Sequence, residues 1–170
     1  MTAMRPVPAR AEHSTPIAHL RDDLTRRLRR GGSDQWAPGE VAPAQVRAQI
    51  ERGQWWVLEE DFLVAAVRVL ESDPQVWPEP GPEPARYVHG LMVDHRAAGR
   101  RLGEGLLAWV EARAARAGCA LVRLDCVAAN PALCAYYERL GYRARGQMSF
   151  AEHLAWHPVM RYEKPVARTA

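Results

Sequence analysis

The segment Tyr87–Leu107 joins an apolar strand, a turn rich in glycine and arginine, and the start of an amphipathic helix. A strand that leads directly into a helix N-terminus presents unpaired backbone N–H groups and the positive end of the helix dipole. Such a turn can hold an anion, most often a phosphate group. Arg100 and Arg101 lie in the turn and would add two positive charges. An ordinary strand–loop–helix connection with surface arginines explains this segment equally well.

The segment Asn130–Tyr142 is the second stretch that could carry chemistry. Asn130 suits a helix N-cap, and Gly141 can supply the left-handed residue that ends the helix. Capping does not explain the adjacent Tyr136 and Tyr137. Taken alone, a tyrosine on an amphipathic helix is more often part of the core than a proton donor.

These segments sit within an alternating order of predicted elements. Helices are expected over Pro16–Arg30, Pro43–Arg52, Arg101–Ala117 and Pro131–Leu140. Strands are expected over Met4–Val7, Trp55–Glu59, Phe62–Leu70, Tyr87–Val93, Leu121–Val127, Tyr142–Phe150 and Val159–Pro165. Five prolines make Asp73–Pro84 a loop. The order predicts a mixed α/β sheet with helices on both faces, in one domain of residues 1–170. Val159–Pro165 is expected at a sheet edge, where it could pair two chains.

The composition excludes several classes of protein. Hydrophobic residues make up 48% of the 170 residues and charged residues 25%, as in soluble globular proteins. The net charge of +3 is modest, and the one arginine cluster, Arg26–Arg30, lies at a predicted helix C-terminus where cations are favourable. We therefore expect no nucleic-acid partner. No apolar run is long enough to cross a bilayer and no secretory signal is visible, so we expect no membrane association and a cytoplasmic location.

Neither the cysteines nor the histidines show the spacing of a metal site. Cys119, Cys126 and Cys134 suit neither a zinc site nor a disulfide framework, and we expect them to be small buried hydrophobes. His153 and His157 are four residues apart, but no third ligand accompanies them. No metal is expected.

Taken together, the two segments resemble the GNAT superfamily of acyl-CoA-dependent N-acetyltransferases. The run Ala98-Gly99-Arg100-Arg101-Leu102-Gly103 resembles its acyl-CoA signature, strand–(Arg/Gln)-x-x-Gly-x-(Gly/Ala)–helix. Its second segment, Asn-x-x-Ala-x-x-x-Tyr-Glu-x-x-Gly-Phe, is matched by Asn130, Tyr137, Glu138, Gly141 and Tyr142. Either motif alone is weak, whereas both in this order with a strand between them are strong.

The match to the acyl-CoA signature has two departures. Ala98 replaces the usual Arg or Gln, and Arg101 stands where the signature prefers Gly. A side chain at Arg101 is compatible with a bound diphosphate if the backbone N–H points inward and φ stays negative. The guanidinium could also pair with a phosphate oxygen.

The resemblance implies a GNAT-type fold that binds acetyl-CoA as cosubstrate. In this fold a mostly antiparallel sheet contains one parallel pair, here Tyr87–Val93 and Leu121–Val127, which splays at its C-terminal ends. The pantetheine arm would pair with the backbone of Leu91, Met92 and Val93. Main-chain N–H groups of Gly99, Arg100, Arg101, Leu102, Gly103 and Glu104 would hold the diphosphate. Asn130 would contact the cofactor arm or an ordered water.

The resemblance also implies direct attack of an amine on the acetyl thioester. Tyr137 matches the tyrosine that protonates the leaving thiolate. Asp125 lies where some members place a carboxylate, and His89 is a natural base two residues from Leu91, on the same face of the pleat. Either residue, or a water chain, could deprotonate the amine.

The acceptor is expected to be a primary amine of a small molecule. Acetylation of a protein N-terminus or a lysine side chain is one alternative, and a non-catalytic acyl-CoA-binding module of the same fold is another. The sequence favours neither a monomer nor a homodimer.

Overall fold

The structure, a computed structural model, describes residues 4–167 of the chain. A seven-stranded sheet has the order β1-β2-β3-β4-β5-β7-β6. The strands are β1 (Val7–Pro8), β2 (Trp55–Glu59), β3 (Leu63–Leu70), β4 (Ala85–Val93), β5 (Leu121–Val127), β6 (Arg143–Met148) and β7 (Val159–Pro165). The α-helices are α1 (Ser14–Arg30), α2 (Pro43–Glu51), α3 (Leu102–Arg116) and α4 (Pro131–Arg139). The sheet is mostly antiparallel and contains one parallel pair, β4 and β5, which confirms the predicted mixed α/β class.

The chain divides into two compact units that share β4. One unit contains the residues up to Val69 together with Gly90–Leu106, and the other contains Leu70–His89 together with the residues from Leu107 onward. The acyl-CoA signature thus belongs to the first unit. The predicted acid and base residues belong to the second.

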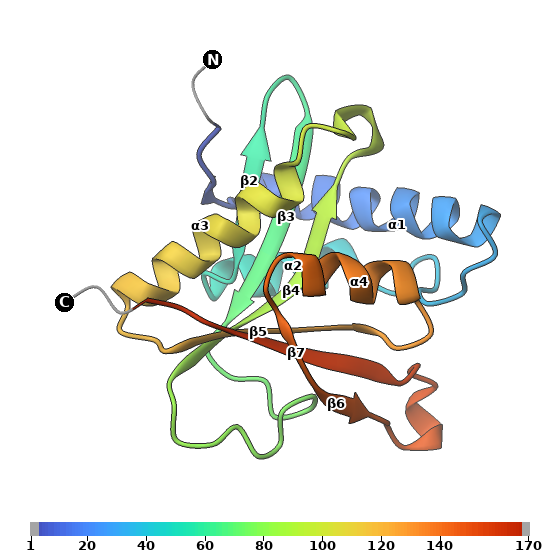
Figure 1. Cartoon of the computed structure of the whole chain (residues 1–170). Helices are drawn as coiled ribbons and strands as arrows, with labels where there is room; N and C mark the ends of the chain where they lie inside the picture. Colours follow the sequence, from blue (N-terminus) through green and yellow to red (C-terminus); the bar gives the residue numbers. More distant parts are fainter. Residues whose placement is uncertain (1–3, 168–170) are drawn as a thin grey trace. The chain divides into compact units, whose positions relative to one another are not determined.

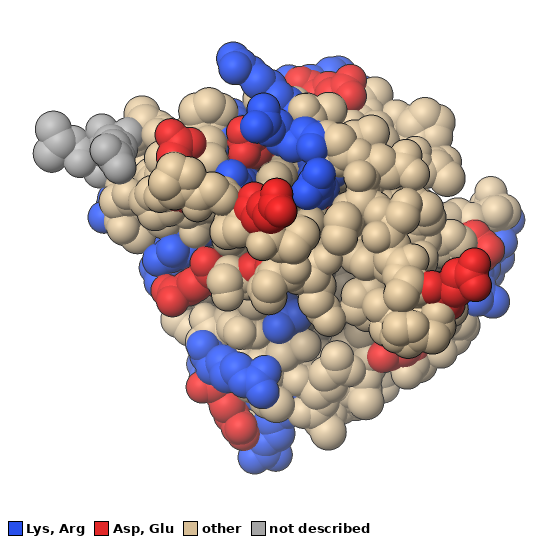
Figure 2. Space-filling model, turned by 90° about the horizontal axis from the view of Figure 1, so that it is seen from below, with Lys and Arg blue, Asp and Glu red and all other residues tan. Residues whose placement is uncertain are grey.

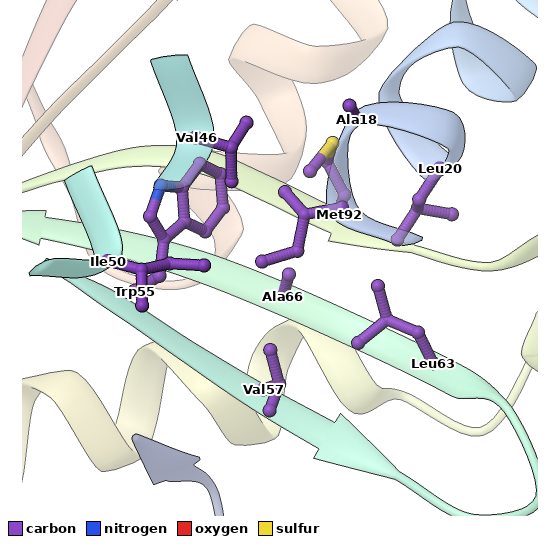
Figure 3. Close-up of a cluster of buried hydrophobic side chains, with 10 residues drawn as sticks. Ala18, Leu20, Val46, Ile50, Trp55, Val57, Leu63, Ala66 and Met92 are labelled. Carbon is purple, nitrogen blue, oxygen red and sulfur yellow. The ribbon is translucent and has the colours of Figure 1, made fainter. Parts of the chain in front are cut away.

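The first unit is built around a core between two helices and the β2–β3 hairpin (Figure 3). Ile17 and Leu20 face this core because three-residue spacing places them on one side of α1. Trp55 of β2 and Met92 of β4 project into the same cluster, with Ile50 of α2 beside Trp55. The Trp55 indole donates a hydrogen bond to Oε1 of Gln49, which satisfies its buried N–H group.

The second unit is built on β5, which pairs with β4 on one side and β7 on the other. The parallel register runs from Ala85 opposite Leu121 to Val88 opposite Leu124. The divergence expected for β4 and β5 beyond these pairs stays a prediction. On the other side, β7 pairs along the whole length of β5, and β6 pairs with the outer side of β7 (Figure 1).

The expectation that Val159–Pro165 lies at a sheet edge was wrong. β7 lies between β5 and β6, so both of its edges are already hydrogen-bonded. The C-terminal strand inserts beside β5, and the preceding strand β6 becomes the edge. β7 therefore has no open edge with which to pair two chains.

Most predicted element boundaries agree with the structure. The bounds of β2, β5 and β7 are those expected, and each α-helix begins and ends within two residues of its prediction. The N-terminal strand is shorter and later than expected, Val7–Pro8 in place of Met4–Val7, because proline limits its pairing. The loop expected over residues 73–84 is present between β3 and β4.

The structure shows the distribution of charge on one face and the length and polarity of the helices. Acidic and basic side chains are interspersed over the face shown in Figure 2. Within residues 4–167, every helix is too short or too polar to traverse a lipid bilayer.

Candidate active site

The turn between β4 and α3 is anchored by Asp94. The Asp94 carboxylate accepts hydrogen bonds from the backbone N–H of Arg96 (2.9 Å) and from its guanidinium (2.8 and 3.0 Å). These hydrogen bonds lower the pKa of Asp94 to about 2. The Asp94 N–H donates to the carbonyl oxygen of Val64 at 2.8 Å, which ties the end of β4 to β3. The turn therefore begins from a fixed point.

Four backbone amides of this turn have no protein acceptor. The N–H groups of Gly99, Leu102, Gly103 and Glu104 make no hydrogen bond to any residue in the described part of the chain. Leu102, Gly103 and Glu104 are the first three residues of α3, whose N–H groups have no partner one turn earlier in the helix. With the positive end of the helix dipole behind them, these amides form an anion-binding turn.

Arg101 takes up the backbone conformation that its signature glycine would have. Its φ angle is +56°, in the left-handed region, and Gly99 in the same turn has φ +81°. The condition of a negative φ, stated above for compatibility of an Arg101 side chain with a diphosphate, is therefore not met. A side chain costs about 1–2 kcal/mol in this region, so the turn keeps its shape at the expense of local strain.

The two turn arginines are paired with acidic side chains. The Arg100 guanidinium lies 2.7 Å from Oε1 of Glu60, and the Arg101 guanidinium lies 2.6 Å from Oε2 of Glu104. The pKa of Glu60 is lowered by its hydrogen bond with Arg100. Because both charges are partly compensated, the anion-binding capacity of the turn rests mainly on its main-chain amides.

The strand that leads into this turn is bent at Gly90. Gly90 has φ +55°, and a Cβ atom added there would lie 2.7 Å from Cη2 of Trp55. The regular alternation of side chains is interrupted at this point, so the spacing of two residues between His89 and Leu91 does not place them on one face. Met92 is buried, with its side chain in the core (Figure 3). Only its backbone is available for the predicted cofactor contact.

In the second unit, the structure brings the two predicted bases together. His89 Nδ1 lies 3.9 Å from Oδ1 of Asp125, because β4 and β5 run in parallel register up to the preceding residue pair. A third residue, Asp73, joins them: its Oδ2 atom lies 2.8 Å from His89 Nε2. The imidazole ring thus has a carboxylate beside each of its nitrogen atoms.

Asp125 is a mostly buried carboxylate with an unsatisfied oxygen. Its Oδ1 atom has no hydrogen-bond partner within residues 4–167. Burial raises the pKa of Asp125, and the nearby charge of Asp73 raises it further, while His89 acts in the opposite direction. A proton or a cation placed next to such a carboxylate stabilises it.

Tyr137 lies on α4, which packs on the face of β5 and β7 opposite to that of Asp125. Its ring packs edge-on against Tyr136 and Tyr142, with centroids 5.3 and 6.0 Å away, and tilted against Tyr162. Its hydroxyl makes no hydrogen bond to any residue the structure describes. Burial raises the pKa of Tyr137, with Cys126 next in effect. The phenol is therefore held in its protonated form, as a proton donor must be.

Asn130 and Cys134 lie at the N-cap and in the first turn of α4. The Asn130 side chain accepts a hydrogen bond from the Leu133 N–H at 3.1 Å, as expected for an N-cap. Cys134 on α4 lies beside Cys126 on β5, with 3.6 Å between their sulfur atoms. Cys119 and Cys126 are buried, as predicted, and Cys134 is half-buried.

Asp73 is the site residue that sequence reasoning missed. It lies in the proline-rich loop, with no neighbouring motif to mark it. The one available signal is weak: an aspartate that precedes Pro74 and opens a turn closed by the Trp77 N–H, which donates to the Asp73 carbonyl oxygen.

The group Asp73, His89 and Asp125 has the residue types of a metal site, with one potential ligand atom from each within 4.8 Å of the others. However, the two carboxylates face different ring nitrogens, and a cation binds only one of them. The arrangement suits proton transfer, because one carboxylate lies beside each ring nitrogen. His153 and His157 are also unsuited, because the short helix Glu152–Leu154 ends between them.

Comparison with known proteins agrees with this geometry. The family model of the acetyltransferase (GNAT) family matches residues 18–142. The chain is 34% identical over 155 residues to the uncharacterised N-acetyltransferase YesJ of Bacillus subtilis (strain 168), covering 86% of each.

Solved structures show the same fold. A GNAT-family acetyltransferase of Listeria monocytogenes superimposes with a TM-score of 0.78 at 23% identity, covering 98% of this chain and 99% of that one. One from Streptococcus agalactiae gives 0.81 at 18% identity, covering 96% of each. YncA of Salmonella typhimurium, a putative acetyltransferase whose structure contains acetyl-CoA, gives 0.70 at 16% identity, covering 99% and 97%. With its family model, its relative and its fold in agreement, the chain belongs to the GNAT family of acetyltransferases and is an acyltransferase.

Proposed function

We propose that this enzyme transfers the acetyl group of acetyl-CoA to a primary amine of a small molecule, by direct attack within a ternary complex. The observation that carries the proposal is the set of four unpaired amides, at Gly99, Leu102, Gly103 and Glu104. A diphosphate supplies several acceptor oxygens and negative charge, which is the complement of these donors.

The amine must lose a proton before it attacks. An ammonium has no lone pair, so a base must accept its proton; His89 and Asp125 are the candidates, and they lie beside one another. The nitrogen then bonds to the thioester carbonyl carbon and the C–S bond breaks. Tyr137 donates a proton to the departing thiolate, for which its protonated and unpartnered hydroxyl is suited.

The small-molecule acceptor is supported by the burial of the two carboxylates beside His89. Asp73 and Asp125 are both largely buried, with side chains 8% and 15% exposed. A small cationic amine can approach such carboxylates. The attraction between its positive charge and theirs offsets the cost of removing its bound water.

A thiol-release assay tests the proposed reaction. Purified protein is mixed with acetyl-CoA and a panel that contains small primary amines, peptides with free N-termini and lysine-bearing peptides. We expect release of free CoA with small amines. Turnover with peptides alone would assign a protein acceptor, and CoA binding without turnover on any amine would make the chain a non-catalytic acyl-CoA-binding module.

A further inference from the structure

The loop between β3 and β4 presents one buried carboxylate, Asp73. The other acidic residues of this loop, Glu71, Glu79 and Glu83, are exposed. Asp73 is held inward because the next turn of chain, Val76 and Trp77, packs into the core of the second unit. A buried carboxylate is costly unless it has a partner, and the partner of Asp73 is His89.

The hydrogen bond between Asp73 and His89 determines which nitrogen of the neutral imidazole carries the proton. A carboxylate oxygen accepts, so the Nε2 atom of His89 is the donor across the 2.8 Å contact. In the neutral ring the lone pair then resides on Nδ1, on the side of Asp125. A carboxylate that orients a histidine in this way sets its tautomer and raises its basicity.

Three other titratable groups lie near Asp125. Arg161 is the strand partner of Asp125 across β5 and β7. Its guanidinium is directed toward the Trp77 ring, 5.2 Å from the centroid, and toward backbone carbonyls. Cys126 and Tyr137 lie on the other face of β5, and burial raises the pKa of both, which keeps them neutral. Asp73 and Asp125 are two carboxylates that lie beside the His89 ring, one at each nitrogen atom.

We infer that Asp73 is a positioning residue that makes His89 the general base, with Nδ1 as the atom that takes the proton from the acceptor ammonium. The inference rests on the proposed function of the same site. The N–H bond of the ammonium breaks and its electron pair stays on the amine nitrogen. The proton moves to Nδ1, and the resulting imidazolium lies between two carboxylates, which stabilise its positive charge. Asp125 thereby acts as the counter-ion, and the proton later returns to solvent.

The central experiment compares Asp73→Asn with wild type by NMR, without acetyl-CoA. The ring ¹⁵N shifts of His89, assigned by difference from His89→Asn, report its tautomer and its titration. We expect the Nε2–H tautomer in wild type and a mixture in Asp73→Asn, with the titration midpoint lower by about one pH unit. Asp73→Glu should restore both in part. Glu71→Gln removes an exposed charge of the same loop and should leave both unchanged.

The kinetic counterpart is the pH profile of kcat/KM for the acceptor. The acidic limb should move to lower pH by the same amount in Asp73→Asn, and the plateau should fall about 10- to 100-fold, with an unchanged KM for acetyl-CoA. In the His89→Asn background, Asp73→Asn should have no further effect on the plateau.

The outcomes separate this inference from the proposed function. An unchanged His89 tautomer and titration in Asp73→Asn, or an unchanged acidic limb, would overturn the inference while acetyl transfer stands. The expected NMR changes in a protein that acetylates no amine would support Asp73 as the residue that positions His89 and refute the proposed reaction instead.

Discussion

Gly90 of β4 lies so close to Trp55 of β2 that a single added Cβ atom would come within 2.7 Å of the indole ring. The same glycine has φ +55°. Close contact and backbone conformation therefore both require glycine at this position. Gly90 directly precedes Leu91–Val93, the segment predicted to pair with the pantetheine arm. The backbone conformation of Gly90 therefore determines the direction in which this segment runs.

Gly90→Ala should destabilise the protein strongly. The methyl group must displace Trp55, whose indole is buried in the core, and the left-handed backbone adds strain. We expect a loss of about 2–4 kcal/mol in the free energy of unfolding, measured by urea denaturation. Gly99→Ala is the matched control, since Gly99 has φ +81° but open space around an added Cβ. It should cost only about 1 kcal/mol, and equal losses would refute the role given to Trp55.

Position 101 should tolerate glycine and reject a β-branched residue. Arg101→Gly relieves the left-handed strain but loses backbone restriction and the ion pair with Glu104, so its stability should stay within about 0.5 kcal/mol of wild type. Arg101→Val should cost about 1–2 kcal/mol, because a branched Cβ is disfavoured at φ +56°. Arg100→Val, at a residue without positive φ, should cost less. Equal stabilities for Arg101→Val and Arg100→Val, measured by urea denaturation, would show that the turn relaxes freely.

Tyr137→Phe should reduce kcat without weakening acetyl-CoA binding. Removal of the proton donor leaves the thiolate to depart unassisted, and we expect a fall of about 100-fold or more in kcat. Steady-state kinetics and calorimetry measure the two quantities separately.

Tyr142→Phe provides the control for Tyr137→Phe. The Tyr142 hydroxyl donates to Glu111 at 2.9 Å, so this variant should lose about 1–3 kcal/mol of stability and keep its kcat. If Tyr137→Phe leaves turnover at the wild-type level, Tyr137 has no part in the reaction.

Asp125→Asn should stabilise the protein at neutral pH while it lowers activity. Burial raises the pKa of Asp125 above the unfolded value of about 3.9. The folded state therefore binds the proton more tightly than the unfolded state. Wild-type stability falls as pH rises from about 4 through the folded pKa. The Asn variant lacks this loss.

The difference in stability between the two proteins should be near zero below about pH 3 and grow to about 1–2 kcal/mol at about pH 7. Thermal or urea unfolding over this pH range measures it. A difference that shrinks as pH rises would mean that the native structure stabilises the ionised form of Asp125.

Local patterns in the sequence predicted the elements well and their spatial order less well. β5 was predicted with its observed bounds because a mainly apolar run lies between Gly118 and Asn130-Pro131. The place of β7 was missed, since nothing within Val159–Pro165 specifies that it inserts between β5 and β6.

The candidate site likewise contains residues that the sequence indicated and residues that it did not. Asp125 and His89 could be predicted because each lies on a strand of the parallel pair. Asp73 could not, because it reaches His89 from a loop whose path is set by the packing of Trp77. The left-handed conformation of Arg101 was also missed, since an arginine gives no sign of a positive φ that the turn imposes on it.

The most direct test of the central claim is calorimetry of the purified protein with three ligands: CoA, dephospho-CoA and pantetheine. The first two contain the diphosphate and the third does not. If the amides from Gly99 to Glu104 hold that group, CoA and dephospho-CoA should bind within about tenfold of one another, and pantetheine should bind at least about 100-fold more weakly. No heat with CoA, or equal affinity for pantetheine, would contradict the account.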